Sequence, residues 1–472
     1  MRSETPRFLV TAAASGSGKT LLTCGILEAL RQRGLRPASF KCGPDYIDPM
    51  FHSRVIGAKS RNLDTFFTDA PTTRYLLERN SRGCDVAVVE GVMGYYDGLA
   101  GRSERGSSYD VARITDTPAI FVVNARGMGN SVIPAIKGFL DHQSDSHIRG
   151  VILNRISQAQ YGWMKELIEE RLDVQVVGYA PELKDCVLES RHLGLLMPDE
   201  IQGIREKLHE LGRVLGETLD LDAILALGRE AGGCPPEERA AMEARLEELR
   251  ESLGGKRPRI GLARDEAFCF FYEDDLELLR DMGAELVEFS PLRDSRLPEG
   301  LDGLILNGGY PELHAKALSE NRSMRESVRT AILDGLPVRA ECGGFLYLHD
   351  TLEDMEGTAW EMAGVIHGRA YKTSRLGRFG YVTLAEEKDG QTMSVFGNQI
   401  GPVRAHEFHY FDSENCGEAF WAQKPLSPKG WRCMHSGETM LAGFPHLYYY
   451  SDLRLPQAFL RACIRRQEER KR

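Results

Sequence analysis

The 472-residue sequence has few cysteines, no long apolar run and no excess of basic residues. Its ten cysteines include no Cys-x-x-Cys pair, which argues against a disulfide-rich scaffold and against a zinc site of the usual spacing. Lys and Arg number 59 against 69 Asp and Glu, so the net charge is −10. This charge argues against binding along the phosphate backbone of a nucleic acid.

No window reaches the roughly 18 to 20 apolar residues that a membrane-spanning helix needs. Residues 1–7 are charged and precede only a short apolar stretch, unlike a secretory signal peptide. We therefore expect a cytoplasmic protein with reduced cysteines that binds neither nucleic acid nor membrane.

The composition, 42% hydrophobic and 27% charged, is that of a globular protein, and the length predicts two or three domains. Short apolar runs alternate with segments of helical period, which is typical of βαβ units in a parallel sheet. These runs are Phe8–Ala12, Val86–Val89, Ala119–Val123, Val151–Leu153 and Val174–Val177, followed later by Ile260–Ala263, Glu285–Phe289, Leu304–Leu306 and Val338–Ala340.

Between residues 231 and 259 the composition shifts to Gly-Gly-Cys-Pro-Pro, then a polar helix, then Gly-Gly-Lys-Arg-Pro. Such punctuation is typical of a domain boundary. We predict two α/β domains, at residues 1–235 and 258–472, joined by a linker at 236–257.

The first strand runs into Ala-Ser-Gly-Ser-Gly-Lys-Thr at residues 14–20 and then into a helical stretch, the context of a P-loop. Backbone N–H groups of Ser15, Gly16, Ser17 and Gly18 would surround phosphate oxygens. Lys19 would reach the outer phosphates, and the Thr20 hydroxyl could bind Mg²⁺. The alternative is a Gly/Ser-rich turn, and Ala13 replaces the usual first glycine.

Acidic residues follow other predicted strands of this domain. Glu90 ends an apolar strand, as does the carboxylate beside the nucleotide's magnesium in P-loop proteins; the alternative is a glutamate facing solvent. Asp45 and Asp48 lie in Lys41–Pro49, just past a strand end, and Asp97 lies in a later loop near the same rim. The alternative is that this segment is an ordinary surface turn, because the dipeptides Asp-Pro and Gly-Pro are common in turns.

In the second half, Cys342 stands between an apolar strand and an apolar helix and precedes two glycines. Such an elbow exposes a nucleophile, and the N–H of Gly343 favours a thiolate and an oxyanion. The segment Leu306–Glu312, which contains Gly309, is a second source of N–H groups. The alternative is a small buried hydrophobic cysteine. His406, His409 and His446 are candidate bases, and spacing does not choose among them.

Several motifs, taken in order, resemble the cobyrinate a,c-diamide synthase family over nearly the whole chain. They are Lys41–Pro49 with His52, Asn62–Asp64, Glu90–Gly98, Leu306–Leu313, Ala340–Gly344 and Gly401–Tyr410.

The resemblance implies an amidoligase that uses ATP, Mg²⁺ and glutamine to amidate the a- and c-acetate side chains of a corrinoid. Its amino-terminal P-loop domain would be like dethiobiotin synthetase and its carboxy-terminal domain a class I glutamine amidotransferase. A homodimer is usual in the family.

The resemblance also implies residue roles. Residues 15–20 would hold the triphosphate, with Thr20, Asp45 and Glu90 around Mg²⁺ and with Lys19 and Lys41 neutralising the transferring phosphoryl group. Asn154 would contact adenine, whereas Tyr46, Asp48 and Asp97 would face the tetrapyrrole. Cys342 would be the glutaminase nucleophile and His446 its base.

Two departures accompany this assignment. The common triad has Glu two residues after the histidine, where this chain has Tyr448, and Gly-Phe-Pro before His446 is unusual. A Cys342/His446 dyad should still function, because the third group chiefly orients the base.

Three alternatives remain open at this point. The substrate could be another tetrapyrrole, such as nickel-sirohydrochlorin or sirohaem. A later family branch amidates several carboxylates of an adenosylated corrinoid, but it usually lacks the motif at residues 43–49. A P-loop partitioning or switch protein would have no reason to carry the amidotransferase half.

Overall fold

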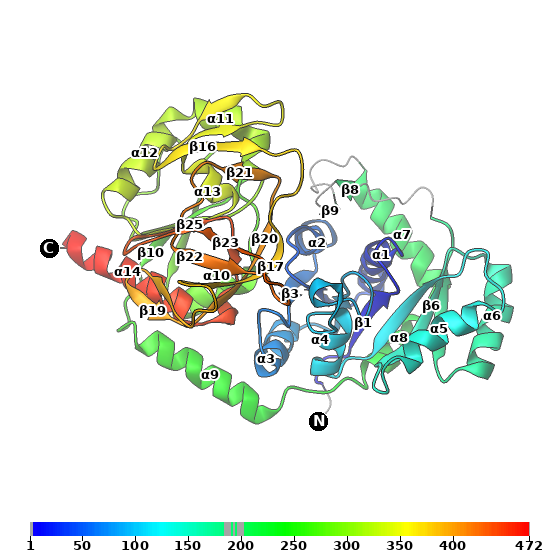
Figure 1. The fold of residues 1–472 in the computed structure, drawn as a ribbon. Helices are drawn as coiled ribbons and strands as arrows, with labels where there is room; N and C mark the ends of the chain where they lie inside the picture. Colours follow the sequence, from blue (N-terminus) through cyan, green and yellow to red (C-terminus); the bar gives the residue numbers. More distant parts are fainter. Residues whose placement is uncertain (1–2, 184–189, 192–193, 196–202, 472) are drawn as a thin grey trace. The chain divides into compact units, whose positions relative to one another are not determined.

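The computed structural model describes residues 3–183, 190–191, 194–195 and 203–471. The chain forms two compact units, Met1–Met242 and Glu243–Arg472 (Figure 1). Each unit is described separately below.

The first unit is built around a seven-stranded sheet of order β3-β2-β4-β1-β5-β6-β7, in which every pairing is parallel. Its strands are nearly all buried, which is why most of them, β2 and β3 excepted, appear in the sequence as apolar runs. They are β1 Arg7–Ala12, β2 Pro37–Cys42, β3 Lys59–Leu63, β4 Val86–Glu90, β5 Ala119–Asn124, β6 Ile148–Asn154 and β7 Gln175–Ala180.

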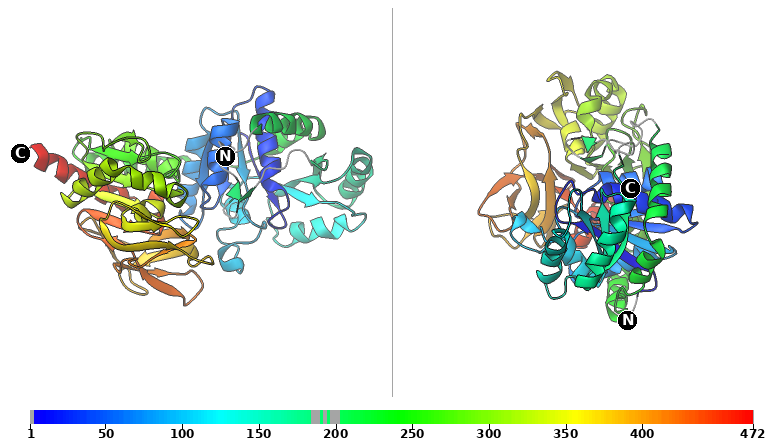
Figure 2. Two further views of the ribbon diagram at one scale, coloured as in Figure 1. Left: turned by 90° about the horizontal axis from the view of Figure 1, so that it is seen from above. Right: turned by 90° about the vertical axis from the view of Figure 1, so that its right-hand side faces the viewer.

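Helices cover both faces of this sheet, as expected of a doubly wound fold (Figure 2). Helix α1 packs closely on α7, because Gly25 has no side chain to separate them. A methyl group at this position would overlap the side chains of Leu211 and Leu215. The helices are α1 Lys19–Gln32, α2 Ile47–Phe51, α3 Ala70–Ser81, α4 Ser108–Thr115, α5 Val132–Asp141, α6 Gln158–Arg171, α7 Ile204–Thr218 and α8 Leu221–Gly228, and a short pair of strands is formed by β8 Ser190–Arg191 and β9 Gly194–Leu195.

The second unit has a six-stranded sheet of order β11-β10-β12-β13-β25-β24, parallel except for β24. Its strands are β10 Arg259–Ala263, β11 Glu285–Phe289, β12 Gly303–Leu306, β13 Val338–Glu341, β24 His435–Ser436 and β25 Met440–Gly443. The helices are α10 Glu273–Asp281, α11 Ala315–Glu320, α12 Arg322–Leu333, α13 Gly343–Tyr347 and α14 Arg454–Lys471; α9 Pro236–Glu251 lies within the segment expected to be a linker. The prediction that both halves are α/β is confirmed.

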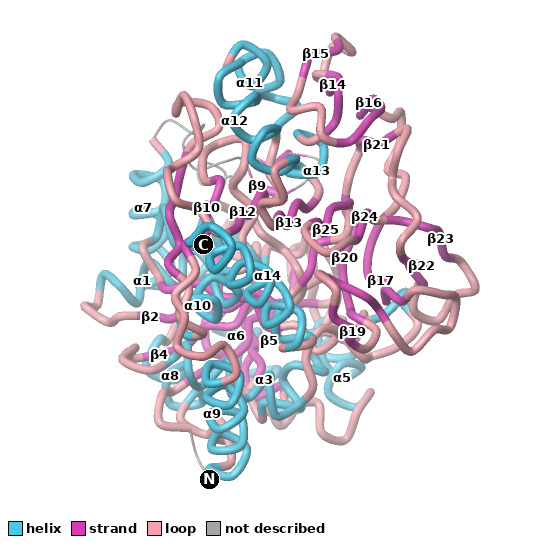
Figure 3. The backbone as a smooth tube through the Cα atoms, turned by 90° about the vertical axis from the view of Figure 1, so that its left-hand side faces the viewer, coloured by secondary structure: helices cyan, strands magenta, loops and turns pink. Residues whose placement is uncertain are grey.

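After β13 the chain forms further sheets, paired antiparallel except between β14 and β16, that the sequence patterns did not predict (Figure 3). One contains β14 His349–Glu353, β15 Ala359–Glu361, β16 Ile366–Lys372 and β21 Phe411–Ser413. Another contains β17 Phe379–Ala385, β20 Val403–Phe408, β22 Phe420–Gln423, β23 Gly430–Cys433 and β26 His446–Leu447, and β18 Met393–Val395 pairs with β19 Asn398–Ile400. Through β26 the second of these sheets includes His446.

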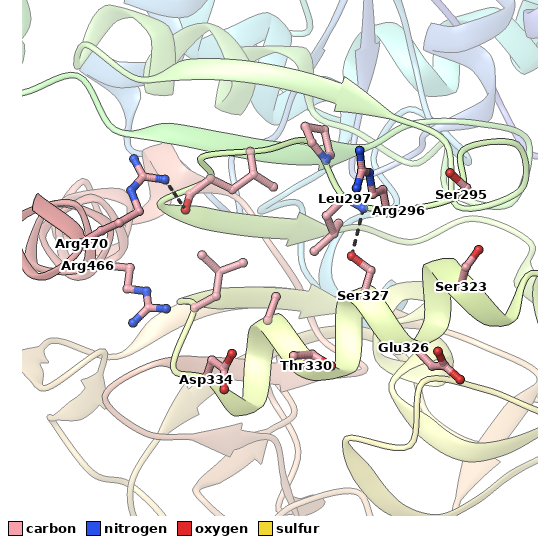
Figure 4. A pocket seen from close by; sticks show the side chains of 14 residues that line it. Ser295, Arg296, Leu297, Ser323, Glu326, Ser327, Thr330, Asp334, Arg466 and Arg470 are labelled. Atoms are coloured by element: carbon pink, nitrogen blue, oxygen red, sulfur yellow. Dashed lines mark hydrogen bonds between the residues drawn. The ribbon is translucent and has the colours of Figure 1, made fainter.

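A cavity of 820 Å³ in the second unit is lined by residues that precede β12 and β13 and by helices α12 and α14 (Figure 4). It therefore lies at the amino-terminal edge of the parallel sheet. Ligands of α/β sheets bind at the opposite, carboxyl edge, where Cys342 follows β13. No helix in the described ranges has the length and apolar character needed to cross a bilayer.

The close approach of α13 to β12 predicts that Gly344→Ala destabilises the second unit. A Cβ on Gly344 would overlap the carbonyl oxygen of Leu306, and backbone cannot move aside as a side-chain end can. We expect a loss of about 3 kcal/mol or more in the free energy of unfolding, measured by urea denaturation. Gly437→Ala is the control, because its added Cβ meets nothing within 4 Å; equal stability of both variants would contradict the prediction.

Candidate active sites

The P-loop of the first unit lies between the end of β1 at Ala12 and the start of α1 at Lys19. Gly16 and Gly18 have φ values of 75° and 94°, which side-chain-bearing residues rarely adopt. Ala13 does not have a positive φ, so its methyl group is accommodated where a glycine is usual. Residues 13–16 are exposed, and their N–H groups are accessible to a ligand at the helix N-terminus.

Asn154 and Lys19 support this loop. The Asn154 Nδ2 donates to the Ser17 carbonyl oxygen at 3.0 Å and would lie 2.8 Å from a Cβ on Gly18. Lys19 Nζ donates to the carbonyl oxygens of Ala14, at 2.9 Å, and Met93. Burial, together with Lys41, lowers the pKa of Lys19 to about 8, although Glu90 and Asp97 oppose the shift. A phosphate ligand would replace the carbonyl partners with a charged one.

A buried ion cluster connects β2 and β4 beside the loop. Lys41 and Glu90 are register partners, and Lys41 Nζ lies 2.5 Å from Asp48 Oδ2 and 2.7 Å from Glu90 Oε1. Thr20 Oγ1 donates to the same Glu90 oxygen at 2.6 Å. Burial would lower the pKa of Lys41, but Asp48 and Glu90 outweigh it, and the pKa is raised well above its usual value. Lys41 is therefore a charged, buried link between two carboxylates.

Burial raises the pKa of Glu90 to about 7, with Asp48 adding to the shift and Lys41 opposing it. The same burial, with Asp48, raises the pKa of Asp45 to about 6. Asp45 Oδ1 accepts from the N–H of Ile47 at 2.8 Å and so begins helix α2. Among the described residues, Asp45 makes no hydrogen bond or ion pair with Thr20 or Glu90, although all three were expected around one magnesium ion.

His52 lies beside Oε2 of Glu90, whereas Lys41 pairs with Oε1. Its Nδ1 lies 2.7 Å from Ser39 Oγ and its Nε2 lies 3.4 Å from Glu90 Oε2. Burial lowers the pKa of His52 to about 4, despite the carboxylate of Asp48, so the ring is neutral near neutral pH. His52 was part of a recognised motif but had no predicted role.

Thr20 and Glu90 fit a magnesium ion. Glu90 Oε2 is buried and accepts no hydrogen bond, and the hydroxyl of Thr20 lies beside the other oxygen. Mg²⁺ usually takes one or two carboxylates and fills its remaining positions with phosphate oxygens and water. No group of three or more His, Cys, Asp or Glu side chains suited to a metal occurs in the ranges described above.

The three residues expected to face a tetrapyrrole differ in exposure. Tyr46 is buried at the start of α2, and Asp48 is buried in its ion pair with Lys41. Asp97 is exposed, and its Oδ2 accepts from the N–H of Gly94 at 3.1 Å. Of the three, Asp97 has the side chain most accessible to a large ligand, whereas Asp48 fixes Lys41.

Cys342 forms a strained elbow in the second unit. It has φ 47° and ψ −104° between the end of β13 and the start of α13. Its N–H donates to the Gly443 carbonyl oxygen at 2.8 Å, and its own carbonyl oxygen accepts from the N–H of Leu346 at 2.9 Å. These bonds hold a conformation that side-chain-bearing residues rarely adopt, and such strain gathers at catalytic positions.

Two glycines lie close together at this elbow. The N–H of Gly343 bonds toward Cys342 and favours the thiolate, and the nitrogen of Gly309 lies 3.0 Å from where a Cβ on Gly343 would be. A joint role of these two N–H groups in an oxyanion site stays a prediction. Burial nevertheless raises the pKa of Cys342 well above its usual value, and Glu312 adds to this. The resting thiol is protonated, so a base must accept its proton.

Two of the three candidate histidines, His409 and His446, differ in their contacts. His409 has both ring nitrogens engaged, Nδ1 with the Phe411 carbonyl oxygen and Nε2 with Glu407 Oε2 at 3.1 Å. His446, in β26, is the register partner of His406 in β20. Its Cε1 would lie 2.7 Å from a Cβ on Gly308, which precedes the predicted oxyanion glycine.

Burial, with His406 and His409 adding to it, lowers the pKa of His446 to about 3. Its ring is thus unprotonated near neutral pH. His446 Nδ1 lies 3.8 Å from Glu341 Oε2, next to the nucleophile in sequence. The position of His446 therefore favours it over His409 as the base.

Sequence reasoning gave no role to Glu341, His52 or Glu407. One feature of the sequence could have pointed to Glu341. It is a glutamate at the end of a predicted buried strand, directly before the cysteine, and charged residues are rarely buried without a partner. His52 and Glu407 lie within the quoted motifs, but no signal identified their distant partners, because His52 meets Glu90 and Glu407 meets Trp431 only once separate elements pack together.

A nucleotide-binding P-loop in one unit and a cysteine elbow with oxyanion glycines in the other define an ATP-using ligase that hydrolyses glutamine. Residues 8–195 match the CobQ/CobB/MinD/ParA nucleotide binding domain, and residues 259–441 match the CobB/CobQ-like glutamine amidotransferase domain.

Proteins named cobyrinate a,c-diamide synthase are similar over almost their whole length. The protein from Caldanaerobacter subterraneus subsp. tengcongensis is 38% identical, over 97% of this chain and 98% of its own. Those from Priestia megaterium and Thermoplasma volcanium are 34% and 33% identical, covering 98% and 99% of this chain and the same shares of their own. The chain belongs to the cobyrinate a,c-diamide synthase family.

The buried cluster predicts that Lys41→Met destabilises the first unit most at high pH. The folded-state pKa of Glu90, about 7, exceeds its ordinary 4.5, so the folded state loses stability as pH rises through this window. Without Lys41 the carboxylate pKa values rise further. We expect a loss of about 3 kcal/mol at about pH 8 and a smaller one at about pH 5.5, measured by chemical denaturation.

Lys137→Met is the matched control, because its ion pair with Asp141 is exposed and should contribute less than about 1 kcal/mol. A loss for Lys41→Met that does not change with pH would contradict the electrostatic explanation.

Proposed function

We propose that the protein amidates the a- and c-acetate carboxylates of cobyrinic acid with ATP and glutamine, giving cobyrinic acid a,c-diamide in cobalamin biosynthesis. The observation that carries this proposal is the full-length similarity to synthases of that name, combined with both half-sites in one chain.

In the synthetase half, a substrate carboxylate oxygen attacks the γ-phosphorus of ATP, and ADP leaves. The acyl phosphate formed is then attacked by ammonia, and phosphate leaves. The N–H groups of residues 15–18 bind phosphate oxygens, while Lys19 and Lys41 offset the charge on the transferring group. Mg²⁺, held by Thr20 and Glu90, would neutralise phosphate charge when bound.

Further residues of this half receive roles in the same proposal. Asn154 contacts the nucleotide from the position where it supports Ser17. Asp45 belongs to the magnesium surroundings, and Tyr46, Asp48 and Asp97 to the tetrapyrrole side. We also propose a cytoplasmic homodimer.

In the glutaminase half, His446 accepts the thiol proton as Cys342 Sγ attacks the glutamine carboxamide. The N–H groups of Gly343 and Gly309 receive the oxyanion, and His446 returns the proton to the departing ammonia. Water then hydrolyses the γ-glutamyl thioester to glutamate. Since ammonia released into neutral solution becomes ammonium, which is not a nucleophile, the two half-reactions have to be coupled.

The nucleophile assignment predicts the behaviour of Cys342→Ala. This variant should lose glutamine-dependent amidation by about three orders of magnitude or more, because no thioester can form. It should still amidate with added ammonium, because the acyl phosphate forms on the other unit. Cys84→Ala is the control and should retain both activities; full glutamine use by Cys342→Ala would refute the assignment.

The substrate is tested by incubating the purified protein with ATP, Mg²⁺ and glutamine, comparing cobyrinic acid with nickel-sirohydrochlorin and sirohaem. Mass spectrometry should find two carboxylates of cobyrinic acid converted to carboxamides and the other tetrapyrroles unchanged. Amidation of nickel-sirohydrochlorin alone would preserve the mechanism but refute the proposed substrate.

A further inference from the structure

A buried carboxylate lies behind the ring of His446. Glu341 is 2% exposed, and its Oε2 is 3.8 Å from His446 Nδ1, while the ring itself is 3% exposed. The two residues come from different sheets, β13 and β26, so this proximity is tertiary. Because Nδ1 faces Glu341, Nε2 is directed to the other side of the ring.

The position that usually supplies the third triad group is used differently. Tyr448, two residues after His446, donates its hydroxyl to Asp274 Oδ2 in α10 at 3.1 Å. The neighbouring Asp275 Oδ1 accepts from the N–H of Tyr449 at 2.9 Å. Tyr448 therefore helps to anchor the segment at residues 448–449 on α10. It brings no carboxylate to the imidazole of His446.

Glu341 is held from two other directions. The N–H of Leu447 bonds to its carboxylate, and Arg339 Nη1 lies 3.4 Å from Oε1. Arg339 is fixed in turn by Asn307 Oδ1, at 2.8 Å from Nη2, and by the ring of Tyr449, 4.6 Å from the guanidinium carbon. Arg339 and the N–H of Leu447 offset part of the carboxylate's charge, although burial still raises the pKa of Glu341 above its usual value, and together they set its orientation before any ligand binds.

Another nearby carboxylate is committed elsewhere. Glu407 accepts from Trp431 Nε1 at 3.1 Å and pairs with His409. It cannot leave these partners without exposing buried polar groups.

We propose that Glu341 is the positioning residue of the glutaminase dyad, taking the place of the usual third triad carboxylate. It keeps the proton on Nδ1 of His446, so that the lone pair on Nε2 accepts the Cys342 proton, and it stabilises the resulting imidazolium. The proton moves from Sγ to Nε2, and the carboxylate stays ionised throughout. This role rests on the proposed glutaminase reaction. In that reaction the distance between His446 Nδ1 and Glu341 Oε2, now 3.8 Å, shortens to a hydrogen bond as glutamine binds.

Two variants of Glu341 test the role. Glu341→Gln keeps the shape and a partner for Arg339 but removes the charge, and we expect kcat for glutamine hydrolysis to fall by about 100-fold or more with KM changed less than about threefold. Glu341→Asp, which keeps the charge, should recover part of this loss. Tyr448→Phe is the matched control and should retain kcat within about threefold. Thermal unfolding of each variant checks that it folds.

A double-mutant cycle with His446→Ala separates positioning from a structural role. The readout is the rate at which the glutamine analogue 6-diazo-5-oxo-L-norleucine alkylates Cys342, followed by mass spectrometry. If Glu341 acts through His446, Glu341→Gln slows alkylation in the wild-type background and causes no further loss beside His446→Ala. Equal losses in both backgrounds, or a large loss for Tyr448→Phe with none for Glu341→Gln, would overturn the proposal.

This test is independent of the corrinoid assignment. Wild-type protein that hydrolyses glutamine but leaves cobyrinic acid unmodified refutes the proposed substrate and leaves the Glu341 comparison valid. If the wild-type protein neither hydrolyses glutamine nor is alkylated at Cys342, the glutaminase assignment is refuted. The role of Glu341 is then refuted with it.

Discussion

Parallel strand pairing is the constraint on which both sites depend. Parallel strands end at one edge of their sheet, so residues that follow strands far apart in sequence come together there. In the first unit this brings the P-loop after β1 next to Lys41 of β2 and Glu90 of β4. In the second it brings Cys342, after β13, beside the turn that follows β25.

Burial then sets the protonation states on which the chemistry relies. A buried carboxylate or thiol resists ionisation unless a cation or N–H group compensates it. Lys41 keeps Asp48 ionised, with a pKa below its usual value despite burial, whereas Glu90 is left near the middle of its titration at neutral pH. In the second unit, burial keeps the thiol of Cys342 protonated and the ring of His446 neutral. On the proposed mechanism the thiolate therefore forms only as it attacks glutamine.

Much of the fold could be predicted from the sequence, because its parallel strands are buried on both faces and appear as continuous apolar runs. Strand β3, Lys59–Leu63, has the polar sequence Lys-Ser-Arg-Asn-Leu and could not be recognised in this way. The antiparallel sheets of the second unit were also missed, since their half-exposed strands are short and mix aromatic, charged and histidine residues. Their existence decides where the base lies, because β26 is held by β20.

The sequence by itself determined the chemistry of the loops, since Gly-Ser-Gly-Lys-Thr after a strand and Cys-Gly-Gly at an elbow work through local backbone geometry. Only the tertiary structure decided which side chains surround those loops. It distinguished His446 from His409, placed Asp48 in an ion pair with Lys41, and brought Glu341 to His446. These contacts join residues on separate elements. Their energies arise from burial and charge pairing that exist only once the sheets have formed, so no local sequence pattern records them.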